Sequence, residues 1–304
     1  MHSKFHSWLS ILGLFFAFAF SAHAQGTQIV GEIRATRVVG QVTVEDIASK
    51  AVLAVVNNAK LTQGSIVRTA QNSSVVLLFA NGASVSLAAN SELNIEQFTH
   101  DPFGGSYEPA KATDEPSVST TNLKLARGEL VGNVKKLKTS AGSKFTVGTP
   151  VGAAGIRGTT FRIVYRPTGI GLAYNFSILT VEGNVEVLLS TGTVNAPPVS
   201  VTDNKEIVIN NVTVNPATNE VVVMSQAGQT VVLATLPPAT DASVTAIQQV
   251  QANAQQIAQA GLNVTFAGDP NLPASGANTA PPGDTPGTPG GTTPNQRITP
   301  GAGL

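Results

Sequence analysis

Short runs of alternating hydrophobic and polar residues fill residues 27–236. An alternation with a period of two places successive side chains on opposite faces of a β-strand, so we expect strands here. The runs are separated by Gly and Asn turns, which is typical of an all-β domain without βαβ units. Three arrangements fit the pattern: a short-stranded sandwich, a rolled sheet and a solenoid-like stack. No sequence period is strict enough to indicate a repeat.

Two hairpins are the clearest local features of this pattern. Asn81-Gly82 lies between two β-forming runs, and both residue types tolerate positive φ, so we expect a two-residue turn. The register of that hairpin puts Val85 and Leu87 on one face and the neighbouring serines on the other. A second hairpin is predicted around Glu182-Gly183-Asn184.

Residues 99–121 interrupt the alternation. They are rich in Gly, Pro, Ser, Thr and charged residues, with few apolar side chains, and they contain His100, Phe103 and Tyr107. We expect a surface loop inserted into the β domain. Loops of this length are either functional or disordered, and the composition favours disorder.

The first 24 residues resemble an export signal. Residues 9–20 are a mainly apolar run, and Ala22-His23-Ala24 has the small-residue pattern of a cleavage site. A bilayer-spanning helix needs about 20 apolar residues. We therefore predict a signal peptide at residues 1–24 and an exported protein with no membrane span after cleavage. An uncleaved anchor or a buried helix is the alternative.

The C-terminal third changes character after Pro237-Pro238. Residues 241–260 have a helical composition with an apolar stripe at spacings of three and four. The stripe comprises Val244, Ile247, Val250 or Gln251, Ala254 and Ile257. We predict a helix that packs on the β domain, or else mediates self-association or a partner contact. Residues 268–304 are rich in Pro, Gly and Thr and are predicted to be a disordered tail.

The charge balance bears on the classes of partner, and the absence of cysteine bears on how the fold is stabilised. The chain has 18 basic and 18 acidic side chains, so its formal net charge of +0 gives no electrostatic reason to expect nucleic acid or an anionic membrane. It has no cysteine, so its stability must come from a hydrophobic core rather than from disulfides. A chain of 304 residues can bury such a core.

A catalytic centre is hard to assemble from this sequence. His100 is the one histidine beyond the predicted signal peptide, and with no cysteine the commoner zinc and Cys–His sites are excluded. A Ser-His-Asp triad would have to use His100 without a G-x-S-x-G elbow. Carboxylate pairs brought together by the fold stay open, although aromatic residues that could stack on sugars make up only 5% of the chain. We predict no catalytic, cofactor or metal site.

The most specific motif lies at residues 144–162. A strand-like run breaks at Gly148 and Pro150, crosses small residues, presents Arg157 and restarts at Thr159-Thr160-Phe161. Thr149-Pro150 followed by residues 154–161 resembles the signature of the FecR-like periplasmic sensor domain. Residues 61–69, 74–87, 89–93 and 127–130 resemble further segments of that family. The resemblance covers residues 36–190 of a β domain predicted at residues 25–236.

The resemblance implies that the motif residues are structural or contact a partner. They are Thr149, Pro150, Gly155, Arg157, Gly158, Thr159 and Phe161. We expect the glycines to let strands pass closely rather than to bind phosphate, because the P-loop spacing is missing and no helix follows. Arg157 is expected to point inward and to pair with Glu129 or Glu182; a ligand or partner contact is the alternative.

The FecR-like family implies a role at the envelope of Gram-negative bacteria, where members sense an outer-membrane transporter and signal to a cytoplasmic sigma factor. This chain is not expected to have the cytoplasmic segment and transmembrane helix of such regulators. We therefore predict a periplasmic or extracellular, non-enzymatic binding or scaffold module, whose partner is an envelope protein or a cell-wall polymer. The alternatives are an extracellular structural or adhesive protein tethered by its tail, and a glycan-active enzyme.

Overall fold

The computed structural model describes residues 27–167, 174–189, 198–214, 221–223, 241–260 and 264–273. Nearly all regular elements among them are β-strands, accompanied by one α-helix and one short 3-10 turn. The predicted all-β class followed by one helix is therefore confirmed. The predicted signal peptide and residues 274–304 of the predicted tail lie outside the described residues.

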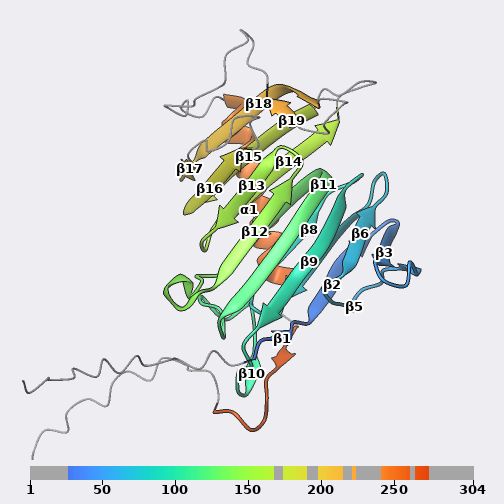
Figure 1. Ribbon diagram of the computed structural model, residues 1–304, viewed down its shortest axis with the longest axis vertical. Helices are drawn as coiled ribbons and strands as arrows, with labels where there is room; N and C mark the ends of the chain where they lie inside the picture. Colours follow the sequence, from blue (N-terminus) through green and yellow to red (C-terminus); the bar gives the residue numbers. More distant parts are fainter. Residues whose placement is uncertain are drawn as a thin grey trace, which may run out of the picture.

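All described strands but two form two large sheets that share the long strand β11 (Figure 1). Sheet I runs in the order β4 (Val52–Ala54), β3 (Val42–Asp46), β6 (Ser65–Thr69), β9 (Glu92–His100), the first half of β11 (Ser119–Asn133), β12 (Lys144–Thr149), β13 (Gly152–Ile156), β16 (Asn184–Leu189) and β17 (Val199–Thr202), with β1 (Ile29–Val30) beside the end of β9. Sheet II runs in the order β5 (Lys60–Leu61), β2 (Ile33–Val39), β7 (Ser74–Phe79), β8 (Ser84–Leu87), the second half of β11, β14 (Thr160–Pro167), β15 (Tyr174–Glu182), β18 (Lys205–Val214) and β19 (Val221–Val223).

Strands that follow one another along the chain are distributed over both sheets. From β12 onward, successive hairpins alternate between the sheets: β12 and β13 lie in sheet I, β14 and β15 in sheet II, β16 and β17 in sheet I again. Neighbouring strands are antiparallel except for β11 and β12, which run parallel. The two sheets are joined through β11 into one closed arrangement, and successive hairpins stack along one axis as in a solenoid (Figure 1).

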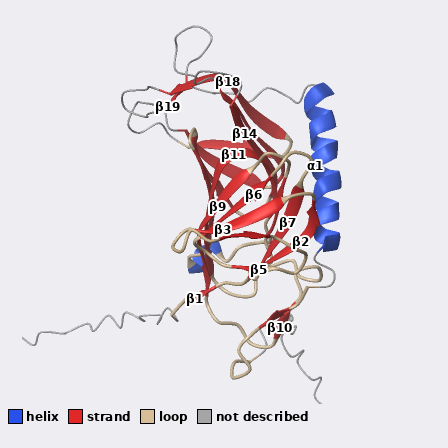
Figure 2. Ribbon diagram, turned by 90° about the vertical axis from the view of Figure 1, so that its right-hand side faces the viewer, coloured by secondary structure: helices blue, strands red, loops and turns tan. Residues whose placement is uncertain are grey.

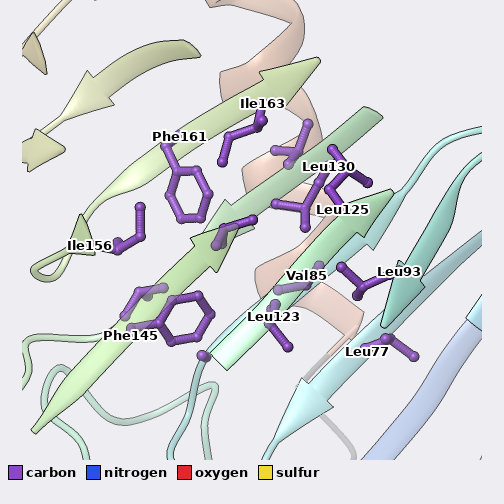
Figure 3. Close-up of a cluster of buried hydrophobic side chains, with 14 of the residues drawn as sticks. Leu77, Val85, Leu93, Leu123, Leu125, Leu130, Phe145, Ile156, Phe161 and Ile163 are labelled. Carbon is purple, nitrogen blue, oxygen red and sulfur yellow. The ribbon is translucent and has the colours of Figure 1, made fainter. Parts of the chain in front are cut away.

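One contiguous cluster of buried side chains from both sheets forms the core (Figure 3). Five phenylalanines are among its largest fully buried members: Phe79, Phe98, Phe145, Phe161 and Phe176. Phe79 packs edge-on against Phe98, with ring centroids 5.1 Å apart. Burial of each such side chain contributes roughly 2 kcal/mol, so this core can stabilise a domain without disulfides.

The turn between β7 and β8 differs from the predicted two-residue turn. Gly82 N donates to Phe79 O at 2.8 Å and has a φ of 88°, whereas Asn81 does not take a positive φ. This arrangement fits a longer loop with a glycine bulge. The reason is tertiary: the Asn81 side chain is only 1% exposed and donates to Ser119 Oγ and Thr121 Oγ1, at 3.1 and 3.3 Å.

Residues 99–121 are not the disordered surface loop that the composition favoured. Strand β10 (Ser106–Tyr107) pairs with β20 (Phe266–Ala267), and Phe103 and Tyr107 are buried. Gly268 N donates to Gly105 O at 2.6 Å, so residues 268–273 also belong to the fold rather than to the tail. The composition was misleading because the residues that cover this segment come from about 160 positions later in the chain.

Helix α1 (Asp241–Ala260) lies along sheet II and contacts β8, β11, β14 and β15 (Figure 2). Val250 and Ile257 are buried against the sheet, whereas Gln251 is exposed. The helix therefore packs on the β domain, the first of the two roles considered for it. In the described part of the chain, no helix combines the length and apolarity needed to cross a membrane.

Candidate functional site

Thr149 and Pro150 close the β12–β13 hairpin. Thr149 Oγ1 accepts the backbone N–H groups of Val151 and Gly152, each at 3.2 Å, and donates to Gly152 O at 2.9 Å. A hydroxyl that satisfies three main-chain groups fixes a tight turn. The first two motif residues therefore have a structural position in this fold.

The motif glycines have different roles. A Cβ added at Gly155 would lie 3.8 Å from Glu186 O, an ordinary contact, so no close strand passage occurs there. The close approach lies at Gly152, where an added Cβ would come within 2.3 Å of Leu188 O. Gly158 takes a φ of 75° where the chain crosses from sheet I to sheet II. Of the two predicted glycines, Gly158 alone needs to be glycine for its backbone.

Arg157 does not point inward as predicted. Its side chain is 60% exposed, and Nη2 donates to Glu186 Oε2 at 3.0 Å rather than to Glu129 or Glu182. The buried Ile156 precedes it, and strand alternation therefore turns Arg157 to the outside. Arg157 thus makes an ion pair, but a solvent-exposed one.

Thr159 and Phe161 lie on the inside of the same crossing. Phe161 is fully buried against Gly132, and Thr159 is buried beside Gly183. Thr159 Oγ1 has no hydrogen-bond partner among the described residues. These two residues hold the crossing in place by packing.

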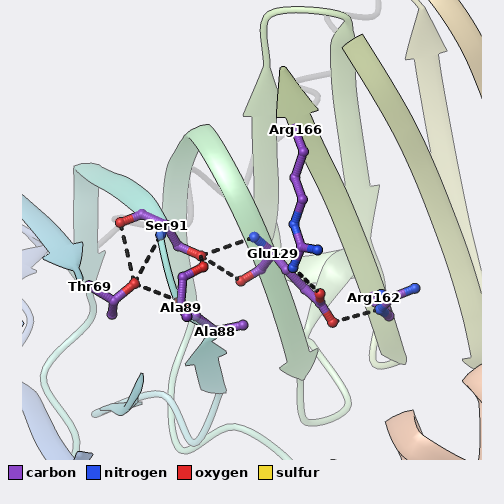
Figure 4. Close-up of polar contacts among 7 residues, drawn as sticks. All are labelled: Thr69, Ala88, Ala89, Ser91, Glu129, Arg162 and Arg166. Atoms are coloured by element: carbon purple, nitrogen blue, oxygen red, sulfur yellow. Dashed lines mark hydrogen bonds and ion pairs between the residues drawn. The ribbon is translucent and has the colours of Figure 1, made fainter. Parts of the chain in front are cut away.

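A second crossing connects the sheets at the other end of β14. Strand β11 leaves β9 after Arg127 and joins β14 at Gly128, which takes a φ of 102°. Ser91 Oγ accepts from Glu129 N at 3.0 Å and donates to Glu129 O at 3.3 Å (Figure 4). Thr69 Oγ1 accepts from Ser91 N at 2.9 Å and donates to Ala88 O at 2.6 Å. Three chain segments are therefore locked together by two hydroxyl groups.

An open hollow of about 670 Å³ lies over this crossing, and we name it the arginine hollow. Its lining residues are Thr69, Ala70, Gln71, Ala89, Asn90, Arg127, Gly128 and Arg166. Five of them come from the predicted family segments at residues 61–69, 89–93 and 127–130, Ala70 and Gln71 directly follow the first of these segments, and Arg166 lies near the end of β14. Among the described residues that line the hollow, two are arginines and none carries a carboxylate.

Arg127 and Arg166 are each paired with a glutamate carboxylate. Arg166 Nη2 donates to Glu129 Oε2 at 2.6 Å, and Arg162 Nε donates to the other oxygen of Glu129 at 2.7 Å (Figure 4). Arg127 Nη2 lies 3.5 Å from Glu92 Oε2, an oxygen that also accepts from Arg68 Nε at 3.2 Å. Each hollow arginine therefore shares its carboxylate with a second arginine.

A buried polar network lies apart from the hollow, at the start of β11. Glu115 is 2% exposed; it accepts from Ser119 Oγ at 2.6 Å, from Lys138 N at 2.6 Å and from Ser143 Oγ. Burial lowers the pKa of nearby His100 and raises the pKa of Tyr107. The network ties residues 99–121 to β11 and to the turn before β12.

The side chains at these sites determine which ligands they can hold. The arginine hollow offers N–H donors and positive charge, and His100 is buried with Nδ1 2.8 Å from Asp101 O. Among the described residues, no three His, Asp or Glu side chains gather to hold a metal ion. The hollow can therefore hold an anionic group, which is the best-defined chemical capability of the described surface.

The sequence analysis did not single out Arg127 or Arg166 as site residues. Gly158, Thr159 and Phe161 lie at the start of β14, about 20 Å from Arg166 at the usual rise per residue. Thr149 and Pro150 lie elsewhere, at the end of β12, where Gly148 is paired with Lys124 of β11. A usable signal was present: the family-like segments 61–69, 89–93 and 127–130 each include a small or hydroxyl residue at a strand end. Such positions are where chain crossings, and the hollows over them, occur.

Comparisons with known proteins agree with the motifs. A family model described as FecR protein matches residues 65–195. Two crystal structures of a candidate anti-sigma factor from Parabacteroides distasonis are similar at 15% and 14% identity, with TM-scores of 0.34 and 0.33. Each similarity covers 52% of this chain, and this chain spans 57% of each of those chains. No curated protein matches the sequence. The predicted resemblance to the FecR family is confirmed by the match at residues 65–195, and the residues that line the arginine hollow all lie within the matched segment.

Proposed function

We propose that this chain is an exported, non-enzymatic FecR-domain module of the cell envelope that binds another envelope component and thereby takes part in envelope sensing. The observation that carries the proposal is the position of the arginine hollow. Segments with FecR-like sequence meet there and form a fixed, cationic surface. The FecR family is one of periplasmic regulators, and this supports binding rather than catalysis as the role of the domain.

The rigidity of the domain supports the same role. Main-chain bonds such as Thr69 N to Ser91 O at 3.0 Å and Asn90 N to Ala70 O at 3.2 Å fix the floor of the hollow. A preformed surface loses little conformational entropy when a partner binds, which favours affinity. The proposed partner is an envelope protein, and a cell-wall polymer is the alternative partner.

A pull-down from envelope extract tests this function. The bait should retain residues 25–304, because a fragment ending at residue 236 would lose α1 and β20 and would uncover sheet II and Phe103. We expect one saturable envelope partner. If the bait is folded and captures no envelope component, the result contradicts the proposal. Cell fractionation tests the exported state separately: recovery of the uncleaved chain in the cytoplasm would contradict it.

A further inference from the structure

We propose that the arginine hollow is a carboxylate-binding site that receives an acidic segment of a partner protein. This proposal rests on the binding function proposed above and names the chemistry of the partner. The argument uses the charges around the hollow, the exposure of its two arginines and the neutral residues between them.

The ion pairs around the hollow leave an excess of positive charge. Five cations take part, namely Lys50, Arg68, Arg127, Arg162 and Arg166, and they share three carboxylates, Glu45, Glu92 and Glu129. Counted over these ion pairs of the described residues, five positive and three negative side chains leave an excess of two positive charges, although the whole chain has a formal net charge of +0. An acidic partner would complete this set of pairs.

The two arginines that line the hollow are the exposed members of the set. Arg127 is 56% exposed and Arg166 is 51% exposed, whereas Arg68 and Arg162 are 32% and 21% exposed. Among the described residues, each hollow arginine contacts its carboxylate through Nη2 alone, and that carboxylate also holds a second arginine, so the pair leaves further N–H donors of the guanidinium unused. A guanidinium presents its donors in a planar fork that matches a carboxylate. The free edge of each fork therefore suits a carboxylate from outside.

The neutral part of the lining favours a polypeptide over a small anion. Gln71 and Asn90 are exposed amides beside the arginines, and amides can donate to main-chain carbonyls as well as to carboxylates. Ala70 and Ala89 leave room for a chain to approach. A volume of about 670 Å³ lies within the range of sites that hold a drug-sized ligand, and it is much larger than one phosphate.

Titration with a labelled hexaglutamate peptide tests the site. The probe is added to the full chain and followed by fluorescence anisotropy, with hexaglutamine peptide, inorganic phosphate and soluble peptidoglycan fragments as competitors. The test variant combines Arg127→Gln with Arg166→Gln. The control combines Lys60→Gln with Lys111→Gln, which removes two exposed cations, each paired with one carboxylate away from the hollow. Thermal melting checks that both variants fold.

The hexaglutamate peptide should bind saturably to the wild-type chain and to the control, and at least about tenfold more weakly to the test variant. Raising the salt concentration from about 0.05 M to about 0.5 M should weaken binding further. Changing both arginines to lysine keeps the charge but removes the forks, and should give an intermediate affinity. Equal binding by the test variant, or no saturable binding to the wild-type chain, would overturn the proposal.

The competitors distinguish the other possible occupants. Displacement by phosphate as effective as by unlabelled hexaglutamate would reassign the hollow to small anions, and tight binding of peptidoglycan fragments would reassign it to the cell wall. The pull-down separates the two proposals. A partner captured equally by wild-type chain and test variant supports the binding module but not the hollow. If hexaglutamate binds but the pull-down captures no partner, the result contradicts the proposed binding module and leaves the carboxylate site standing.

Discussion

The hydroxyl group of Ser91 bonds to both main-chain groups of Glu129, accepting from its N–H at 3.0 Å and donating to its carbonyl at 3.3 Å. Ser91 directly precedes β9 in sheet I, and Glu129 lies where β11 has just entered sheet II. A single side chain therefore joins the two sheets at the floor of the arginine hollow. Ser91 thereby also fixes the main chain of Glu129, whose carboxylate holds Arg162 and Arg166.

Replacing Ser91 by alanine should therefore destabilise the domain. The variant leaves the N–H and carbonyl of Glu129 without this partner, and we expect a loss of about 1–3 kcal/mol in the free energy of unfolding. Urea denaturation measures the loss. Ser200→Ala, which removes an exposed hydroxyl bonded to Asn184, is the matched control and should have a much smaller effect. Equal effects of the two variants would show that the crossing does not depend on Ser91.

Gly128 and Gly142 form a matched pair, because their φ angles are 102° and 104°. A Cβ at Gly128 would lie 2.2 Å from Ser91 Oγ and 2.5 Å from Ser91 Cα, whereas a Cβ at Gly142 would meet nothing within 4 Å. Gly142→Ala should cost about 1–2 kcal/mol through backbone strain alone. Gly128→Ala should cost clearly more, because it adds a collision with the main chain. Equal melting temperatures for the two variants would contradict the close crossing.

Glu115 should be the most sensitive carboxylate in the segment at residues 99–121. Glu115→Ala removes the acceptor for two hydroxyls and the N–H of Lys138, and the buried donors would cost about 3 kcal/mol or more in unfolding free energy. Glu108→Ala removes only a surface pair with Lys111 and should have little effect. Thermal melting of both variants measures the two losses of stability. A mild effect of Glu115→Ala would mean that this segment is not tied to the core as described.

His100 should make stability depend on pH. Burial lowers its pKa below the ordinary value of 6.5, and a hydrogen bond to the Asp101 carbonyl opposes this shift in part. Between the lowered pKa and 6.5 the unfolded chain binds more protons than the folded chain, so stability falls as the pH falls through this window. Compared with His100→Gln, the wild-type chain should lose more unfolding free energy between about pH 7.5 and pH 5. Parallel pH profiles of the two chains would contradict a buried neutral His100.

Local patterns were enough to predict much of the fold. The alternation at residues 174–189 correctly predicted strands β15 and β16, but not their pairing. Strand β15 pairs with β14 and β18 in sheet II, and β16 pairs with β13 and β17 in sheet I, so the predicted second hairpin is wrong. Gly183, with a φ of 93°, lies where the chain crosses between the sheets. The three- and four-residue spacing of Val250 and Ile257 gave helix α1. These elements depend on short-range periodicity, which a single sequence contains.

Features that depend on distant residues could not be predicted in this way. Nothing local shows that β11 changes sheets at Gly128, because the change depends on Ser91 and on Tyr165 as partners. The predicted inward orientation of Arg157 was wrong for a similar reason, because its partner Glu186 lies on the neighbouring strand β16, 29 residues later in the chain. The arginine hollow itself exists only after residues 69, 90, 127 and 166 have been brought together.

The most direct measurement is a competition in the envelope pull-down. The full chain is immobilised, its envelope partner is allowed to bind, and hexaglutamate or hexaglutamine peptide is added as eluant. We expect hexaglutamate to release the partner and hexaglutamine to leave it bound, because the acidic peptide occupies Arg127 and Arg166. A partner that stays bound in saturating hexaglutamate would contradict recognition through the arginine hollow.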